Sequence, residues 1–117
     1  MALDCNSSNL NDKEASHILN TFIRNSGDFT LLRQVSFWKN RLTKIPQEIR
    51  LFPRLTQMNF GYNQINTIRP VDISFASPIV GNDEMVGVFL EGNQINLIEP
   101  GVFDGMWCRS IIICVVT

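Results

Sequence analysis

A ten-residue stretch of this chain occurs twice, and it constrains the fold more than any other feature. Residues 61–70, GYNQINTIRP, return as residues 91–100, EGNQINLIEP, with Asn-Gln-Ile-Asn identical in the two copies. A looser copy begins around Asn40. Each copy has apolar residues two and five places after its first Asn. This spacing predicts one short structural unit that stacks on further copies of itself.

Three apolar positions also precede each Asn, at eight, five and three residues before it. The last two alternate as on a short strand with one buried face, and the Asn follows where the chain turns inward. A buried amide without hydrogen-bond partners costs about 1 to 3 kcal/mol, so each unit needs its neighbours. The nine apolar residues are Leu32, Val35 and Phe37; Leu55, Met58 and Phe60; and Met85, Val88 and Leu90.

The combined spacing, L-x-x-L-x-L-x-x-N-x-L, resembles the leucine-rich repeat family over residues 29 to about 106. The resemblance implies an α/β fold, a short leucine-rich repeat solenoid with parallel strands on its concave face. In that family the Asn side chain lies inside the coil and bonds the backbone of adjacent coils. By this likeness, a structural asparagine ladder would comprise Asn40, Asn63 and Asn93.

Residues 1–28 are expected to form an N-terminal cap, made of a degenerate first coil and one helix. Asn11 can cap the helix, and Glu14 three residues later completes a capping box. Apolar residues recur at helical spacing up to Ile23, and residues 25–27, Asn-Ser-Gly, supply a stop. The helix should therefore pack one apolar face against the first coils.

Residues 29–117 are expected to carry the repeats. The interval from Asn40 to Asn63 is 23 residues, whereas that from Asn63 to Asn93 is 30, so an insertion is expected near 77–84. Beyond Asn93, a 24-residue register places Ile112 and Cys114 on the next strand. The last repeat is then truncated, although residues after Arg109 could instead be unrelated to the repeats.

Composition and motifs narrow the classes of function. Ten basic and eleven acidic residues leave a formal net charge of −1. The chain therefore lacks the excess of positive charge that is typical of nucleic-acid-binding proteins. The longest apolar run, residues 111–116, is far shorter than the roughly 20 residues of a membrane helix, so no membrane insertion is expected. One His and the lack of nucleophile, phosphate-loop and zinc motifs predict no catalytic residues, no cofactor and no metal, and hence no enzyme.

Two features favour an extracellular glycoprotein. Asn6-Ser7-Ser8 is a glycosylation sequon, and the three cysteines, Cys5, Cys108 and Cys114, cannot all pair within the chain. A chance sequon with reduced thiols in a cytoplasmic protein stays open as the alternative. The Leu3-Asp4-Cys5 step, the capped helix and the entry at Phe29 are also similar to secreted arthropod repeat proteins, a group that includes the non-catalytic subunit of shrimp luciferase. That likeness implies a secreted binding subunit with Cys5 bonded to residues upstream.

The residues between the apolar positions would point out from the concave sheet. Because stacked strands lie about 4.8 Å apart, Ser36, Asn59 and Phe89 should form one row, with Trp38 and Tyr62 placed diagonally. Exposed aromatics among polar side chains are typical of an interaction patch, although they could instead cover one another and bind nothing. The candidate partner-binding residues are Arg33, Ser36, Trp38, Gln57, Asn59, Tyr62, Phe89 and Glu91.

These observations favour a protein–protein interaction module that binds an unidentified protein ligand through the concave face. It would be a fragment of a secreted or receptor ectodomain protein. The alternatives are an intracellular leucine-rich repeat scaffold and a non-catalytic accessory subunit of an enzyme complex.

Overall fold

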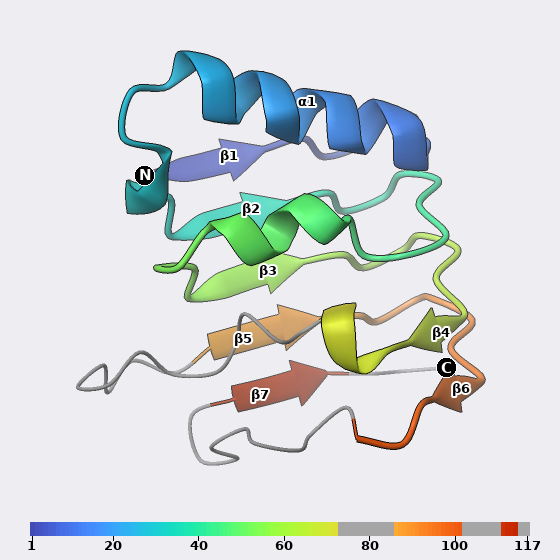
Figure 1. Ribbon diagram of the computed structural model, residues 1–117. Helices are drawn as coiled ribbons and strands as arrows, with labels where there is room; N and C mark the ends of the chain where they lie inside the picture. Colours follow the sequence, from blue (N-terminus) through green and yellow to red (C-terminus); the bar gives the residue numbers. More distant parts are fainter. Residues whose placement is uncertain (73–85, 102–110, 115–117) are drawn as a thin grey trace.

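The computed structural model of the chain describes residues 1–72, 86–101 and 111–114 (Figure 1). The insertion expected near 77–84 lies outside the described residues, as do Met85 and Cys108.

Five short parallel strands form the main sheet (Figure 1). Their register aligns Leu3 with Val35, Val35 with Met58, and Met58 with Val88. Val35, Met58 and Val88 are the positions five residues before the repeated asparagines, so the repeat spacing and the strand register coincide. Leu3 stands five residues before Ser8. In spatial order the strands are β1 (Ala2–Asp4), β2 (Gln34–Ser36), β3 (Gln57–Asn59), β5 (Val86–Phe89) and β7 (Ile111–Cys114).

Helix α1 (Asp12–Asn25) begins and ends where local signals in the sequence place it. The Asn11 side chain accepts a hydrogen bond from the Glu14 backbone at 2.8 Å, and the Glu14 carboxylate accepts one from the Asn11 backbone at 3.0 Å. These reciprocal bonds satisfy two N–H groups that a helix start leaves free. Ala15 and Leu19 are buried on the inner face. The capped helix predicted from the sequence is therefore confirmed.

The second layer consists of α1 and short 3₁₀ helices, which follow one another along one side of the sheet (Figure 1). Within it α1 contacts η2 (Gln47–Leu51), and η2 contacts η3 (Pro70–Asp72). A further turn, η1 (Phe29–Leu31), leads into β2, and β4 (Thr67–Ile68) pairs in parallel with β6 (Leu97–Ile98). The chain is thus an α/β protein with a parallel sheet and a helix.

The core lies between these layers and is rich in phenylalanine. Phe37 and Phe60, directly after β2 and β3, stack with ring centroids 6.0 Å apart and planes 3° from parallel. Phe52, at the end of η2, contacts the rings of Phe22 and Phe29. All described apolar residues that precede the repeated asparagines are buried: Leu32, Val35, Phe37, Leu55, Met58, Phe60, Val88 and Leu90.

Two details differ from the expected pattern. Ile98, five residues after Asn93, is 43% exposed, because no described strand covers the outer edge of β6. In β7, Ile113 aligns with Val88 and Cys114 with Phe89, so the expected alignment of Ile112 with Val88 is wrong by one residue. The backbone pairing in space, rather than a fixed 24-residue count, sets this register.

Candidate functional site

The repeated asparagines sit where each strand turns into its return segment, and all three are buried. Asn63 donates from Nδ2 to the carbonyl oxygens of Phe37 and Phe60, at 2.9 and 3.0 Å, and its Oδ1 accepts from the Leu42 backbone at 2.9 Å. Two of these three partners belong to the preceding strand and its loop. The amide therefore ties two neighbouring segments together.

The other two asparagines repeat this geometry one strand away. Asn40 donates to the carbonyl oxygens of Cys5 and Phe37 and accepts from the Leu10 backbone. Asn93 donates to Phe60 and Leu90 and accepts from Ile65. These distances lie between 2.9 and 3.0 Å, so every turn is held in the same way.

The residue before each of the three asparagines has a left-handed backbone, and so has Ser7, the corresponding residue after β1. The φ angles are 52° at Ser7, 63° at Lys39, 55° at Tyr62 and 74° at Gly92. Glycine adopts this conformation freely, whereas for other L-residues it costs roughly 1 to 2 kcal/mol. Lys39 and Tyr62 are held in it because their backbone N–H groups donate to the carbonyls of Gly61 and Glu91 on the next strand.

The open face of the sheet, defined here as the face opposite the core, carries the predicted row. Ser36 aligns with Asn59, and Asn59 with Phe89, across β2, β3 and β5. Trp38 and Tyr62 follow the ends of β2 and β3, and their rings meet edge to face with centroids 5.7 Å apart. The Lys39 ammonium lies 5.6 Å from the centre of the Trp38 ring. The structure therefore brings the two predicted aromatics into direct contact.

Each of these aromatic rings rests on a glycine of the next strand segment. A Cβ added to Gly61 would come within 3.1 Å of the Trp38 ring, and one added to Gly92 would come within 2.6 Å of the Tyr62 ring. Glycine at these two positions lets the rings approach the backbone closely. Tyr62 is still 53% exposed, so the pair offers aromatic surface to solvent.

Three further predicted residues border this face. Arg33 precedes β2, and its carbonyl oxygen accepts hydrogen bonds from the backbone of Thr56 and Gln57. Gln57 is exposed and pairs with Gln34. Glu91 lies beside Tyr62, whose backbone N–H bonds its carbonyl oxygen at 2.8 Å. The eight predicted residues thus occupy three neighbouring strands and their ends.

The side chains of Asn59 and Ser36 are already hydrogen-bonded within the chain. Asn59 Oδ1 accepts from the Gly61 backbone at 2.9 Å, and the Ser36 hydroxyl donates to Asn6 Oδ1. Asn6 Oδ1 also accepts from the Trp38 backbone at 3.0 Å. Sequence reasoning treated Asn6 only as a sequon and did not place it on the open face. Asn6 lies two residues before the first turn, at the position that Trp38 occupies in the next unit. This equivalence could have placed Asn6 on the open face.

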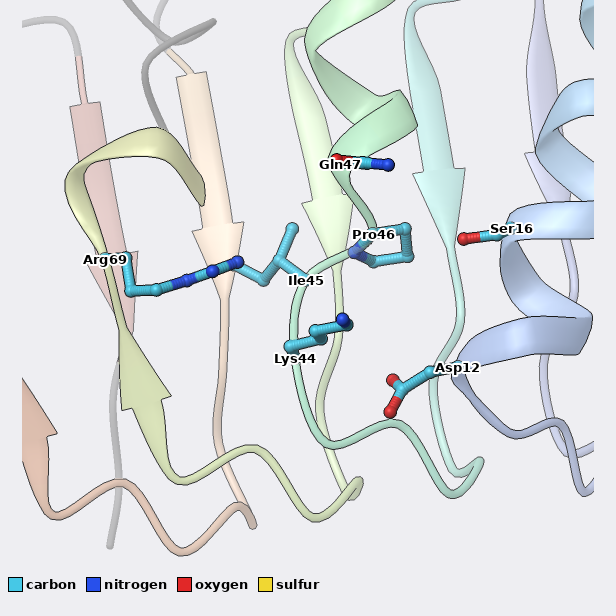
Figure 2. Close-up of a pocket in the computed structure, with 7 residues that line it drawn as sticks. All are labelled: Asp12, Ser16, Lys44, Ile45, Pro46, Gln47 and Arg69. Carbon is cyan, nitrogen blue, oxygen red and sulfur yellow. The ribbon is translucent and has the colours of Figure 1, made fainter.

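A pocket of about 140 Å³ lies on the opposite side, between α1 and the segment that enters η2 (Figure 2). In Figure 2, Asp12 and Ser16 reach in from α1 while Arg69 extends from the β4 side toward Ile45. Asp12 accepts hydrogen bonds from Thr43, and Arg69 is paired with Asp72 at 2.8 Å. Lys44 also lines the pocket, but Asp12 and Arg69 are already used by the fold, so this pocket shows no converging reactive groups.

Cys5 is a free thiol that is partly buried against the core. Burial raises the pKa of the Cys5 thiol, and the charge of the neighbouring Asp4 raises it further. The nucleophilic thiolate is therefore scarce at neutral pH. Nothing in this environment activates Cys5 for chemistry.

Neither protein-family models, curated proteins nor solved structures gave a significant match to the chain. Within residues 1–72, 86–101 and 111–114, no group of three or more His, Cys, Asp or Glu could hold a metal ion. In the same part of the chain, no helix has the length and apolar character needed to cross a membrane. Function must therefore be inferred from the arrangement of the chain's own residues.

Proposed function

We propose that the chain is a leucine-rich repeat module that binds a protein partner through the open face of its sheet. The observation that carries the proposal is the contact between the exposed Tyr62 ring and the half-buried Trp38 ring, both held on the backbone of the next strand. The proposal assigns the module no catalytic activity of its own.

The repeat assignment rests on the agreement of spacing, register and hydrogen bonding. Residues with the same place in the repeat align on neighbouring strands, as Val35 does with Met58. Asn40, Asn63 and Asn93 each bridge to the preceding segment with the same atoms. A stack in which each unit contacts its neighbours is the physical basis of a solenoid.

Protein binding is supported by the chemistry of the open face. Tryptophan, tyrosine and arginine are the residues most enriched at binding hot spots. Trp38 and Tyr62 are ordered before any partner arrives, so binding would cost little side-chain entropy. Gln57, at the start of β3, and Glu91, next to Tyr62, add hydrogen-bonding residues to the same three strands and their ends. Such a platform suits a partner that presents both apolar and polar side chains.

An extracellular location is part of the proposal. The sequon residue Asn6 is exposed, which leaves space for an attached glycan. In this setting the chain would be a portion of a secreted or receptor ectodomain protein.

Photo-cross-linking from matched positions tests the binding face. A benzoylphenylalanine is placed at Gln57 on the open face or at Gln47 on η2, both exposed glutamines. Unglycosylated protein is irradiated with the extracellular protein fraction of its source. We expect discrete higher-mass adducts from position 57 and not from position 47, because only the open face would contact the partner.

Two substitutions of similarly exposed residues complete this test. Tyr62→Ala should weaken formation of the position-57 adduct about tenfold, the effect of losing about 1.4 kcal/mol of binding free energy. Leu51→Ala, on the opposite layer, should leave it unchanged; Tyr62 and Leu51 are 53% and 52% exposed. Equal adducts from both positions, or an adduct insensitive to Tyr62→Ala, would refute the assignment of this face.

A further inference from the structure

We infer that an N-linked glycan on Asn6 covers Trp38 and thereby controls access to the aromatic end of the open face. The inference concerns how binding at the open face is regulated. It rests on the proposed function in two respects, because the chain must be secreted to receive the glycan and must have a partner for that face. Its physical content, that the glycan shields Trp38, can be measured without a partner.

The orientation of the Asn6 amide follows from its donors. Trp38 N–H and the Ser36 hydroxyl both donate to Oδ1, and a backbone N–H can donate only to an acceptor. Oδ1 therefore faces Trp38 N, and Nδ2 lies on the other branch of the amide, away from that N–H. Asn6 as a whole residue is exposed to solvent.

Nδ2 is the atom that carries the sugar in a glycosylated sequon. In the transfer, a bond forms between Nδ2 and the anomeric carbon of a lipid-linked oligosaccharide. The bond from that carbon to the lipid pyrophosphate breaks, the pyrophosphate leaves with the electron pair, and Nδ2 loses one proton. The third sequon residue, Ser8, is also exposed, and its hydroxyl donates to the Asn6 carbonyl at 3.0 Å.

Strand register places this attachment point beside the aromatic pair. The Cys5 backbone donates to Ser36 O at 2.8 Å and the Ser7 backbone to Trp38 O at 2.9 Å, so Asn6 lies alongside Phe37 and Trp38. Neighbouring strands are about 4.8 Å apart, so the first sugar begins one strand from the Trp38 ring. Tyr62 lies one strand further in the same direction and touches that ring.

The glycan would cover the Trp38 ring for a physical reason. The C–H faces of pyranose rings are apolar, and a large aromatic ring is the flattest apolar surface they can pack on. The Asn6 side chain is already fixed by its two Oδ1 bonds, so the first sugar starts from an ordered position. A glycan packed here would exclude a partner from Trp38 while leaving Phe89, two strands beyond β2, uncovered.

Acrylamide quenching of Trp38 fluorescence tests the shielding directly. The chain has two tryptophans, so Trp107→Phe leaves Trp38 as the only one, and Trp107→Tyr serves if that protein does not fold. Protein secreted from eukaryotic cells is compared with the same protein carrying Ser8→Ala, which removes the sequon and keeps Asn6. We expect a Stern–Volmer constant roughly twofold lower with the glycan, because the sugar covers a ring face.

Controls separate the glycan from the substitution. The two proteins made in bacteria, without glycan, should be quenched equally. Trimming the secreted protein to a single N-acetylglucosamine should keep part of the protection, because the first sugar lies nearest the ring. Secretion without a glycan on Asn6 would overturn the inference, as would a glycosylated protein quenched like Ser8→Ala. Neither result affects the binding face, which is tested on unglycosylated protein.

Discussion

Lys39 and Tyr62 show how single residues are held in a costly conformation. Both have φ near 60°, where a Cβ crowds the backbone, and both precede a buried asparagine. The equivalent residue in the third copy is Gly92, which relieves the crowding. Strain of this kind persists only where surrounding bonds impose it, and it often accompanies functional surfaces. Here it directs the Tyr62 ring onto Gly92 and toward Trp38.

Substitutions of Lys39 by glycine and alanine should reveal this strain. Both remove the contact with Trp38, but only glycine relieves the left-handed backbone, so Lys39→Gly should be about 0.5 to 1 kcal/mol more stable than Lys39→Ala. Urea unfolding followed by circular dichroism measures the difference. At Lys44, which has an ordinary backbone, the order should reverse because glycine loses more entropy on folding. The same order at both positions would contradict a strained Lys39.

At the scale of elements, the buried asparagines join each strand turn to the one before it. The short strands have few ladder bonds of their own, and β2 and β3 span only three residues each. Side-chain amides therefore supply bonds that the strands lack, and they satisfy carbonyl groups that burial would otherwise leave unpaired. The neighbouring elements are held together by these polar contacts as well as by apolar packing.

Asn63→Ala should consequently be far more damaging than an alanine at a nearby asparagine. It removes the acceptor of the buried Leu42 N–H and one of the two side-chain amides that bond each of the Phe37 and Phe60 carbonyls, and we expect a loss of about 2 to 3 kcal/mol in the free energy of unfolding. Asn66→Ala, at an exposed asparagine in the same turn, should change it by less than about 0.5 kcal/mol. Similar losses in denaturant titrations of the two variants would show that the amide bonds do not hold the turns.

In the whole molecule, aromatic packing joins the helical layer to the sheet. Phe52 is fully buried at the end of η2 and meets Phe22 of α1 and Phe29 of η1, with ring centroids about 6 Å away. A partly buried polar contact also joins α1 and η2: Glu48 accepts hydrogen bonds from Ser16 and Asn20. The α1 helix is therefore part of the same core as the strands.

Removing the Phe52 ring should weaken the whole structure. Phe52→Ala leaves a cavity between the layers and should lower the free energy of unfolding by about 3 to 5 kcal/mol. Leu51→Ala, at the adjacent residue that is 52% exposed, should change it by less than about 0.5 kcal/mol. Thermal and urea unfolding of both variants provide the measurement. A mild effect of Phe52→Ala would mean that the layers are held chiefly by other contacts.

The sequence alone determined the features that depend on neighbours along the chain. The capping box of Asn11 and Glu14 needs only residues three apart, and the alternation of Val35 and Phe37 identifies a buried strand face whatever lies beside it. From such local patterns the helix bounds and the buried apolar positions could be predicted, whereas the α/β class and the parallel strands were expected from the resemblance of the repeat spacing to leucine-rich repeats. The row of Ser36, Asn59 and Phe89 followed from equal spacing in each copy.

Only the tertiary structure decided which side chains are free on the open face. Ser36 is bonded to Asn6, some thirty residues away, and the Trp38 and Tyr62 rings rest on glycines of other strands. The register of β7 likewise departs from a constant repeat count by one residue. These features arise from contacts across strands, which depend on backbone pairing in space. Spacing within one segment specifies which face a residue occupies but not which distant atom it meets there.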